Sequence, residues 1–125
     1  PDLRDRIADA AAGMGMNKFV RQAPVIIAVV LEKQNMLSAV GSVIQDKEYR
    51  LLDIGIAANQ LCLQAAALGL GTCMVGWFDE NKVKRLLGVD KKRRIPLLIT
   101  LGYSDTPVRQ KVRKPFEEIC GRNRY

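Results

Sequence analysis

The stretch that decides the fold runs from Leu51 to Phe78 and reads LLDIGIAANQLCLQAAALGLGTCMVGWF. Its first part, residues 51–68, is apolar in nearly every helical direction. One narrow polar stripe is the exception, formed at i, i+7 and i+11 by Asp53, Gln60 and Gln64. A helix that is hydrophobic almost all round must be covered on nearly all sides. We therefore expect a partner subunit to cover part of this helix; the alternative is the central helix of a monomer.

The end of this helix is marked by glycines. Gly69 stands where a left-handed C-cap belongs, and Leu70 is placed to fold back as in a Schellman ending. The following run, TCMVGWF at 72–78, is typical of a short buried strand that Gly76 interrupts. A glycine inside a strand often marks close approach of the backbone to another group.

Composition restricts the class of protein. A chain of 125 residues suits one domain, and no apolar run fits a membrane span or a signal peptide. Three scattered cysteines indicate reduced thiols in a cytoplasmic protein. Histidine is absent, which excludes histidine-dependent nucleophilic catalysis and histidine-ligated metals, so we expect no metal site.

The net charge of +7 is concentrated at the C-terminus. Residues 1–90 hold ten Lys/Arg and ten Asp/Glu, whereas residues 91–125 hold ten Lys/Arg and three Asp/Glu. The difference of seven therefore belongs entirely to residues 91–125. Such asymmetry indicates an anionic partner, and nucleic acid, an acidic membrane or a phosphorylated cofactor all satisfy it.

Two further helices have recognisable caps. Asp2 is placed to cap a helix that ends at Gly13 and Gly15, and Asn17 to cap one further turn. Asp79 is placed to cap a short helix that ends at Gly88. Phe78 and Val83 have the spacing of a hydrophobic staple on that helix.

Two more strands are predicted. The run VIIAVVL at 25–31 is continuously apolar and β-branched, which indicates a central strand with helices on both faces. The run IPLLITLGY at 95–103 is a second strand with Pro96 near its start. Residues 32–45 form a loop before a long helix that begins near Asp46, and the tail from Ser104 is mostly extended. This order of elements predicts an α/β or α+β sandwich around one sheet.

Several segments, taken in order, resemble the nitroreductase family of FMN-dependent oxidoreductases. They are an apolar helix that ends in LGLG, a TCMVG strand, a helix that ends in LLG, a strand that ends in LGY, and a KVRKP tail. The resemblance implies an α+β sandwich, with a central mixed sheet flanked by helices, that forms an intertwined homodimer. It covers nearly all of residues 1–125, which we treat as a single domain.

The resemblance also implies a cofactor site for FMN at the subunit interface. In the family, the strand after the central helix passes beside the flavin ring; the matching positions are Val75, Gly76 and Trp77. The family's K-x-R pair, which binds the FMN phosphate, matches Lys111 and Arg113. Arginine and lysine suit a dianionic group, and alternation places both on one side of an extended segment. Chemistry at flavin N5 needs no catalytic side chain.

One departure concerns the N-terminus. Family members begin with an arginine-rich stretch that grips the phosphate, and the sequence from Pro1 does not contain it. We expect this chain to be a fragment that lacks the N-terminal part of the site. The loop at 32–41 matches a variable loop that covers the pocket and sets the substrate in the family.

The expected function is transfer of hydride from NAD(P)H through FMN to a small-molecule electron acceptor such as a nitroaromatic or a quinone. A flavin-binding module without turnover is one alternative. Nucleic-acid binding through the basic tail is another, disfavoured because stacking aromatics are sparse there. We expect neither a nucleic-acid nor a membrane partner.

Overall fold

The computed structural model describes residues 2–33, 41, 44 and 47–123. It is a mixed helix and sheet fold, as predicted. The helices and strands, with two 3-10 helices η1 and η2, follow one another in this order: α1 (Leu3–Ala11), η1 (Gly13–Gly15), η2 (Lys18–Gln22), β1 (Val25–Leu31), α3 (Tyr49–Ala67), β2 (Gly71–Val75), α4 (Glu80–Leu87), β3 (Arg94–Gly102) and α5 (Phe116–Ile119).

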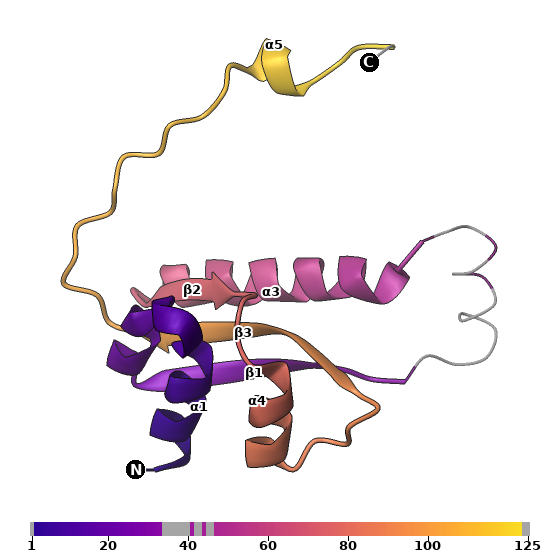
Figure 1. The fold of residues 1–125 in the computed structure, drawn as a ribbon. Helices are drawn as coiled ribbons and strands as arrows, with labels where there is room; N and C mark the ends of the chain where they lie inside the picture. Colours follow the sequence, from indigo (N-terminus) through magenta and orange to yellow (C-terminus); the bar gives the residue numbers. More distant parts are fainter. Residues whose placement is uncertain (1, 34–40, 42–43, 45–46, 124–125) are drawn as a thin grey trace.

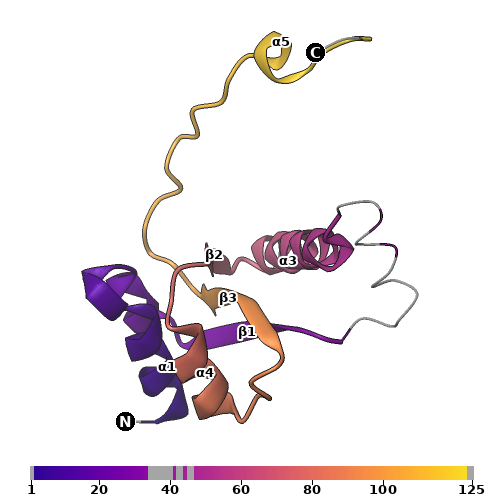
Figure 2. The ribbon, with the colours of Figure 1, turned by 45° about the vertical axis from the view of Figure 1, so that its right-hand side comes forward.

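Three antiparallel strands form one sheet with the order β1-β3-β2. Helices α1 and α4 lie on one face, and α3 lies on the other (Figures 1 and 2). The prediction that residues 25–31 form a central strand is wrong for the described part of the chain, because β3 is central and β1 lies at an edge. The apolar run arises because β1 contacts α1 on one face and α3 on the other.

The sheet register explains how β3 accommodates Pro96. Leu31 pairs with Arg94 and Val29 with Leu97, so β3 has two residues where β1 has one. This extra residue is a β-bulge, which is where a strand tolerates the missing N–H of proline. At the other end of β3, a Cβ on Gly102 would lie 2.6 Å from the Pro24 ring. Glycine at 102 therefore lets β3 pass close to the start of β1.

The main core lies between the sheet and the pair α1 and α4. The helices are capped as predicted: an Asp2 carboxylate oxygen accepts from the Asp5 N–H, and one of Asp79 from the Lys82 N–H, both at 2.9 Å. Val83 is fully buried and Phe78 packs against the same cluster, as the staple spacing predicts. The buried cluster comprises Ile7, Ala8, Ala10, Ala11, Val20, Val75, Val83, Ile95 and Leu98.

Helix α3 has the predicted glycine ending. Gly69 is left-handed (φ 75°), and its N–H donates to the Ala66 carbonyl while the Leu70 N–H donates to the Ala65 carbonyl. These two bonds define a Schellman motif. The helix begins at Tyr49, later than the predicted start near Asp46, and Glu48 provides no side-chain cap there. Among the described helices, none is long and apolar enough to cross a membrane.

The strand after α3 is shorter and less buried than predicted. It ends at Val75, and the side chains of Cys73 and Met74 are exposed. Strand β2 is an edge strand of this sheet, so its outer side meets no further strand among the described residues. Beyond β3 the tail is extended as predicted and runs clear of the other elements to the single turn α5 (Figure 1).

Candidate functional site

The turn after β2 displays backbone to solvent between two apolar anchors. Val75 is 3% exposed in the core, and Phe78 packs half-buried against the same core. Between them, Gly76 is exposed, and the Trp77 side chain is 63% exposed. Trp77 is therefore not a core residue. We call residues 76–77 the glycine turn.

Gly76 is not required by the packing of this chain. A Cβ built on Gly76 would meet no heavy atom within 4 Å, and its φ is not in the left-handed region. Its lack of a side chain therefore leaves the backbone open to close approach from outside.

Two hydrogen bonds hold the glycine turn from the side of α1. The Asn17 side-chain amide donates to the Trp77 carbonyl at 2.8 Å, and the Asp79 N–H donates to the Ala10 carbonyl at 3.1 Å. Asn17 precedes the 3-10 helix η2 as predicted, but its side chain does not cap it. Within residues 2–33 and 47–123, and apart from the strand ladders, neither Gly76 nor Trp77 donates its backbone N–H to another group.

The predicted phosphate ligands lie on the tail. Lys111 and Arg113 are exposed in its extended segment, where Val112 between them is 99% exposed. Gly71, at the start of β2, pairs with Gly102, at the end of β3. The tail therefore leaves the sheet at the opposite end of β2 from the glycine turn, and it runs away from the body in both ribbon views (Figures 1 and 2). One chain alone does not bring the two halves of the predicted site together.

Helix α3 carries an uncovered apolar surface. Its own chain buries mainly Ala58 and Ala65. The large apolar side chains that stay 48–63% exposed are Leu51, Leu52, Ile56, Leu63 and Leu68. Large apolar side chains left exposed along one helix of a globular protein indicate an interaction site. The described part of the chain therefore does not provide the cover that the apolar sequence of this helix requires.

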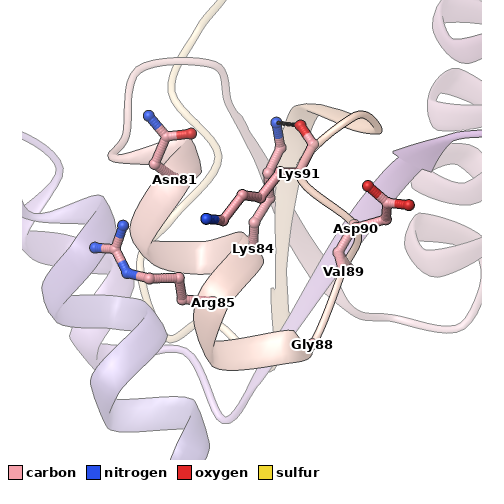
Figure 3. A pocket seen from close by; sticks show the side chains of 7 residues that line it. All are labelled: Asn81, Lys84, Arg85, Gly88, Val89, Asp90 and Lys91. Carbon is pink, nitrogen blue, oxygen red and sulfur yellow. Dashed lines mark hydrogen bonds between the residues drawn. The ribbon is translucent and has the colours of Figure 1, made fainter.

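A separate hollow of about 580 Å³ lies between α4 and the turn that follows it. Figure 3 shows that it is lined by Lys84, Arg85 and Asn81 from α4 and by Asp90 and Lys91 from the turn. Lys84 is only 6% exposed, and its ammonium lies 3.0 Å from Glu80. No predicted cofactor residue lines this hollow.

The Glu80 carboxylate contacts two cationic side chains and one backbone N–H in this region. The carboxylate accepts from the Arg94 guanidinium at 3.0 Å and from the Ile95 N–H at 2.8 Å, besides Lys84. Burial alone would raise the pKa of Glu80, but the bonds from Arg94, Ile95 and Lys84 together lower the pKa from 4.5 to about 2. Glu80 also raises the pKa of Arg94 above its ordinary value. This network ties α4 to β3.

Other reactive groups are few in the part of the chain that the structure describes. No group of three or more Cys, Asp or Glu side chains is arranged to hold a metal ion there. Cys62, Cys73 and Cys120 are free thiols, and the last two are exposed rather than set in apolar surroundings. The predicted substrate loop at 32–41 falls mostly outside the described residues, which include only 32–33 and 41 of it.

The fold is an α+β sandwich. In it, the apolar helix α3 is followed by the strand β2 and then by the exposed glycine turn. The model of the nitroreductase family matches residues 2–103 of this chain. The chain therefore belongs to the nitroreductase family, and the resemblance seen in the sequence is confirmed.

Individual relatives agree with this assignment. An oxygen-insensitive NADPH nitroreductase of Helicobacter acinonychis is 37% identical over 70 residues, covering 55% of this chain and 33% of that protein. A nitroreductase family protein of Streptococcus pneumoniae has the same fold, with a TM-score of 0.76 and 24% identity over 98% of this chain and 75% of that one. The NADPH:FMN oxidoreductase of Vibrio harveyi, solved with NAD⁺, gives a TM-score of 0.75 at 22% identity, covering 98% of this chain and 55% of that one. The chain spans less than half the length of the curated relatives it matches.

Proposed function

We propose that the protein is an FMN-dependent oxidoreductase that passes hydride from NAD(P)H through the flavin to an electrophilic acceptor such as a nitroaromatic or a quinone. Family membership supports the oxidoreductase class. The exposed backbone of the glycine turn, held between the anchors Val75 and Phe78, is the single observation that carries the flavin proposal. We treat residues 1–125 as one nitroreductase-like domain.

The residues present fit the two ends of FMN. The backbone N–H groups of Gly76 and Trp77 offer donors to the ring, and Gly76 offers no side chain to block it. Lys111 and Arg113 offer a point charge and a bidentate fork to the phosphate. Bound FMN supplies acceptance and donation of hydride at N5, while the protein binds and orients the ring. Val75, Gly76, Trp77, Lys111 and Arg113 are thus the proposed cofactor residues.

A homodimer is part of the proposal, because one chain separates these two groups. The uncovered surface of α3 is suited to pack against a second copy of itself, since an interface of this kind resembles a core cut in half. In the dimer, we place the tail cations and the glycine turn around one cleft beside α3. This arrangement uses the C-terminal positive charge without a nucleic-acid partner.

An absorption spectrum of the purified protein tests the proposed function. We expect flavin bands near roughly 370 and 450 nm that bleach when NADPH or NADH is added without oxygen. A protein that takes up FMN but is bleached by neither nucleotide would instead be a flavin-binding module without turnover. A protein that takes up no FMN would contradict the flavin proposal.

Substitutions at Gly76 test whether the ring lies against the glycine turn. Gly76→Val should fold normally, because its Cβ meets nothing within 4 Å in the chain itself. We expect it to weaken FMN binding about tenfold or more, equivalent to about 1.4 kcal/mol, and Gly76→Ala to weaken it less. Fluorescence titration of FMN measures the affinity, and circular dichroism checks the fold. Unchanged FMN affinity in Gly76→Val would place the ring elsewhere.

A further inference from the structure

Asn17 has a backbone conformation that frees its side chain for a distant contact. Its φ of 53° and ψ of 29° lie in the left-handed region, which asparagine tolerates better than most residues. The side chain makes no cap bond to η2, although the Asn17 carbonyl accepts from the Val20 N–H at 3.0 Å. The amide instead reaches Trp77, 60 residues away in the sequence.

The contact is chemically specific. The Trp77 carbonyl is only an acceptor, so the NH₂ end of the Asn17 side chain must face it. At 2.8 Å from nitrogen to oxygen, the hydrogen bond is at the short end of the usual range. Aspartate has the same shape and tolerates the same backbone conformation, but it would place an oxygen against that carbonyl.

Asn17 stands on a segment that is fixed to the rest of the molecule. Val20, three residues on, is fully buried in the main core. The Arg4 guanidinium of α1 donates to the Arg21 carbonyl at 2.7 Å, and Arg21 pairs with Asp9 of α1 at 2.9 Å. The donor is therefore held in place independently of the glycine turn, as a positioning group requires.

We propose that Asn17 is a positioning residue that fixes the glycine turn for its ligand. Its side chain holds the Trp77 carbonyl, and the bond from the Asp79 N–H to the Ala10 carbonyl holds the next peptide group along the chain. The two bonds fix the Trp77–Phe78 and Phe78–Asp79 peptides, and Val75 is fixed in β2 on the other side. The N–H groups of Gly76 and Trp77 lie between these fixed points and so keep one direction before any ligand arrives. Preorganisation of this kind raises affinity by lowering the entropy lost on binding. The step toward flavin rests on the proposed function, whereas the restraint on the turn does not.

Asn17→Gly is the cleanest test, because glycine adopts φ of 53° without strain and removes only the side-chain donor. Asn17→Asp keeps the shape and reverses the polarity of the contact. Asn123→Gly is the matched control, since Asn123 is also left-handed (φ 65°) but lies beyond α5 on the tail. The first measurement is hydrogen exchange of the Asp79 amide in flavin-free protein, because this N–H is bonded to the Ala10 carbonyl whereas those of Gly76 and Trp77, strand ladders apart, are not bonded within the described residues. The second measurement is FMN titration of the same proteins.

We expect Asn17→Gly to speed exchange of the Asp79 amide and to weaken FMN binding about three- to tenfold, the range of one neutral hydrogen bond. Asn17→Asp should weaken it more, and Asn123→Gly should change neither quantity. The melting temperature of Asn17→Gly should stay near that of the unsubstituted protein, which separates positioning from general destabilisation. Unchanged exchange of the Asp79 amide in Asn17→Gly would overturn the proposal.

Failure of the proposed function gives a different result. If the unsubstituted protein does not bind FMN, the titration fails for every variant, and the exchange comparison still decides whether Asn17 restrains the turn. If exchange rises in Asn17→Gly while FMN affinity stays the same, the restraint exists but does not serve the flavin, and the proposed positioning role is wrong.

Discussion

Glu80 joins α4 to the start of β3 through several bonds. One carboxylate accepts from a guanidinium, an ammonium and a backbone N–H, and its side chain is 22% exposed. Loss of such a carboxylate would leave the mostly buried Lys84 ammonium without its partner. Removing one member of a buried ion pair costs more than the pair contributes, because the remaining charge is left uncompensated.

The lowered pKa of Glu80 predicts a pH dependence of stability. A carboxyl with a folded-state pKa of about 2 and an ordinary value of 4.5 contributes stability that is fully present above about pH 5. This contribution is lost as the pH falls from about 5 toward 2, and we expect it to amount to roughly 2 kcal/mol after allowance for solvent screening. Urea unfolding at pH 6 and pH 3 measures it.

Glu80→Gln is the variant for comparison. It should be less stable at pH 6 and should lose less stability than the unsubstituted protein between pH 6 and pH 3. Glu117→Gln, on the exposed turn α5, is the control and should leave the pH dependence as it was. An equal loss in Glu80→Gln and the unsubstituted protein would assign the acid sensitivity to other carboxyls.

For single residues, the sequence predicted helix caps, which depend on nearby residues, but not contacts between residues far apart in the chain. The caps at Asp2, Asp79 and Gly69 follow from neighbours within a few positions, and the structure confirms them. The bond from Asn17 to Trp77 joins residues 60 apart, and the burial of Lys84 depends on Glu80 and β3. Contacts of this kind arise only when the chain has folded, so no local pattern indicates them.

Helix α3 has an apolar surface that its sequence predicts to be covered and that the described chain leaves exposed. Leu52, Ile56 and Leu63 fall within about 40° of one another at about 100° per residue, so they form one exposed stripe. Asn59 is a polar residue that lies about 20° to one side of this stripe. The opposite side packs on β1 and β2. A helix that is apolar on both sides is stable in water only when both sides are covered.

Charge placed on this stripe should weaken the proposed dimer. We expect Leu63→Glu to raise the dimer dissociation constant at least about tenfold, the effect of losing one central apolar anchor. Gln64→Glu adds the same charge on the polar stripe of the same helix, about 80° or more from each of Leu52, Ile56 and Leu63, and should have a much smaller effect. Sedimentation equilibrium over a range of concentrations measures both. A protein that is monomeric without substitution, or a Leu63→Glu variant that associates as well, would contradict the assignment.

The sequence predicted the helices and strands better than it predicted which strands lie next to each other in the sheet. The apolar run of β1 indicated helices on both faces, and this is confirmed, but it did not indicate whether the strand is central or at an edge. Burial of a strand's faces and pairing of its edges are independent properties, and side-chain pattern reports only the first. For the same reason, the exposed side chains of Cys73 and Met74 on β2 were not predicted from their apolar surroundings in the sequence.

In the whole molecule, the positively charged tail lies apart from the glycine turn, and the proposed dimer would bring the two together. All of the net positive charge belongs to residues 91–125, and the tail that carries much of it leaves the sheet away from the glycine turn. Both halves of the candidate site were predicted only through the family resemblance. In the proposed dimer a second subunit unites them, and a single sequence does not describe that subunit.

The tail cations predict a difference between two flavins that share one ring. If Lys111 and Arg113 bind the phosphate, Lys111→Gln and Arg113→Gln should each weaken FMN binding about tenfold or more, since bonds to charged groups contribute about 1.5–3 kcal/mol. Riboflavin has the same ring without a phosphate, so its affinity should not change. The FMN affinity of both variants should also fall less steeply with salt, because one charge contact is missing.

Lys114→Gln is the control for these two variants. It removes a neighbouring cation on the other side of the extended segment and should change the affinity for neither flavin. Equal losses for FMN and riboflavin would mean that the tail supports the fold or the dimer rather than the phosphate. Unchanged FMN affinity in both variants would remove the tail from the site.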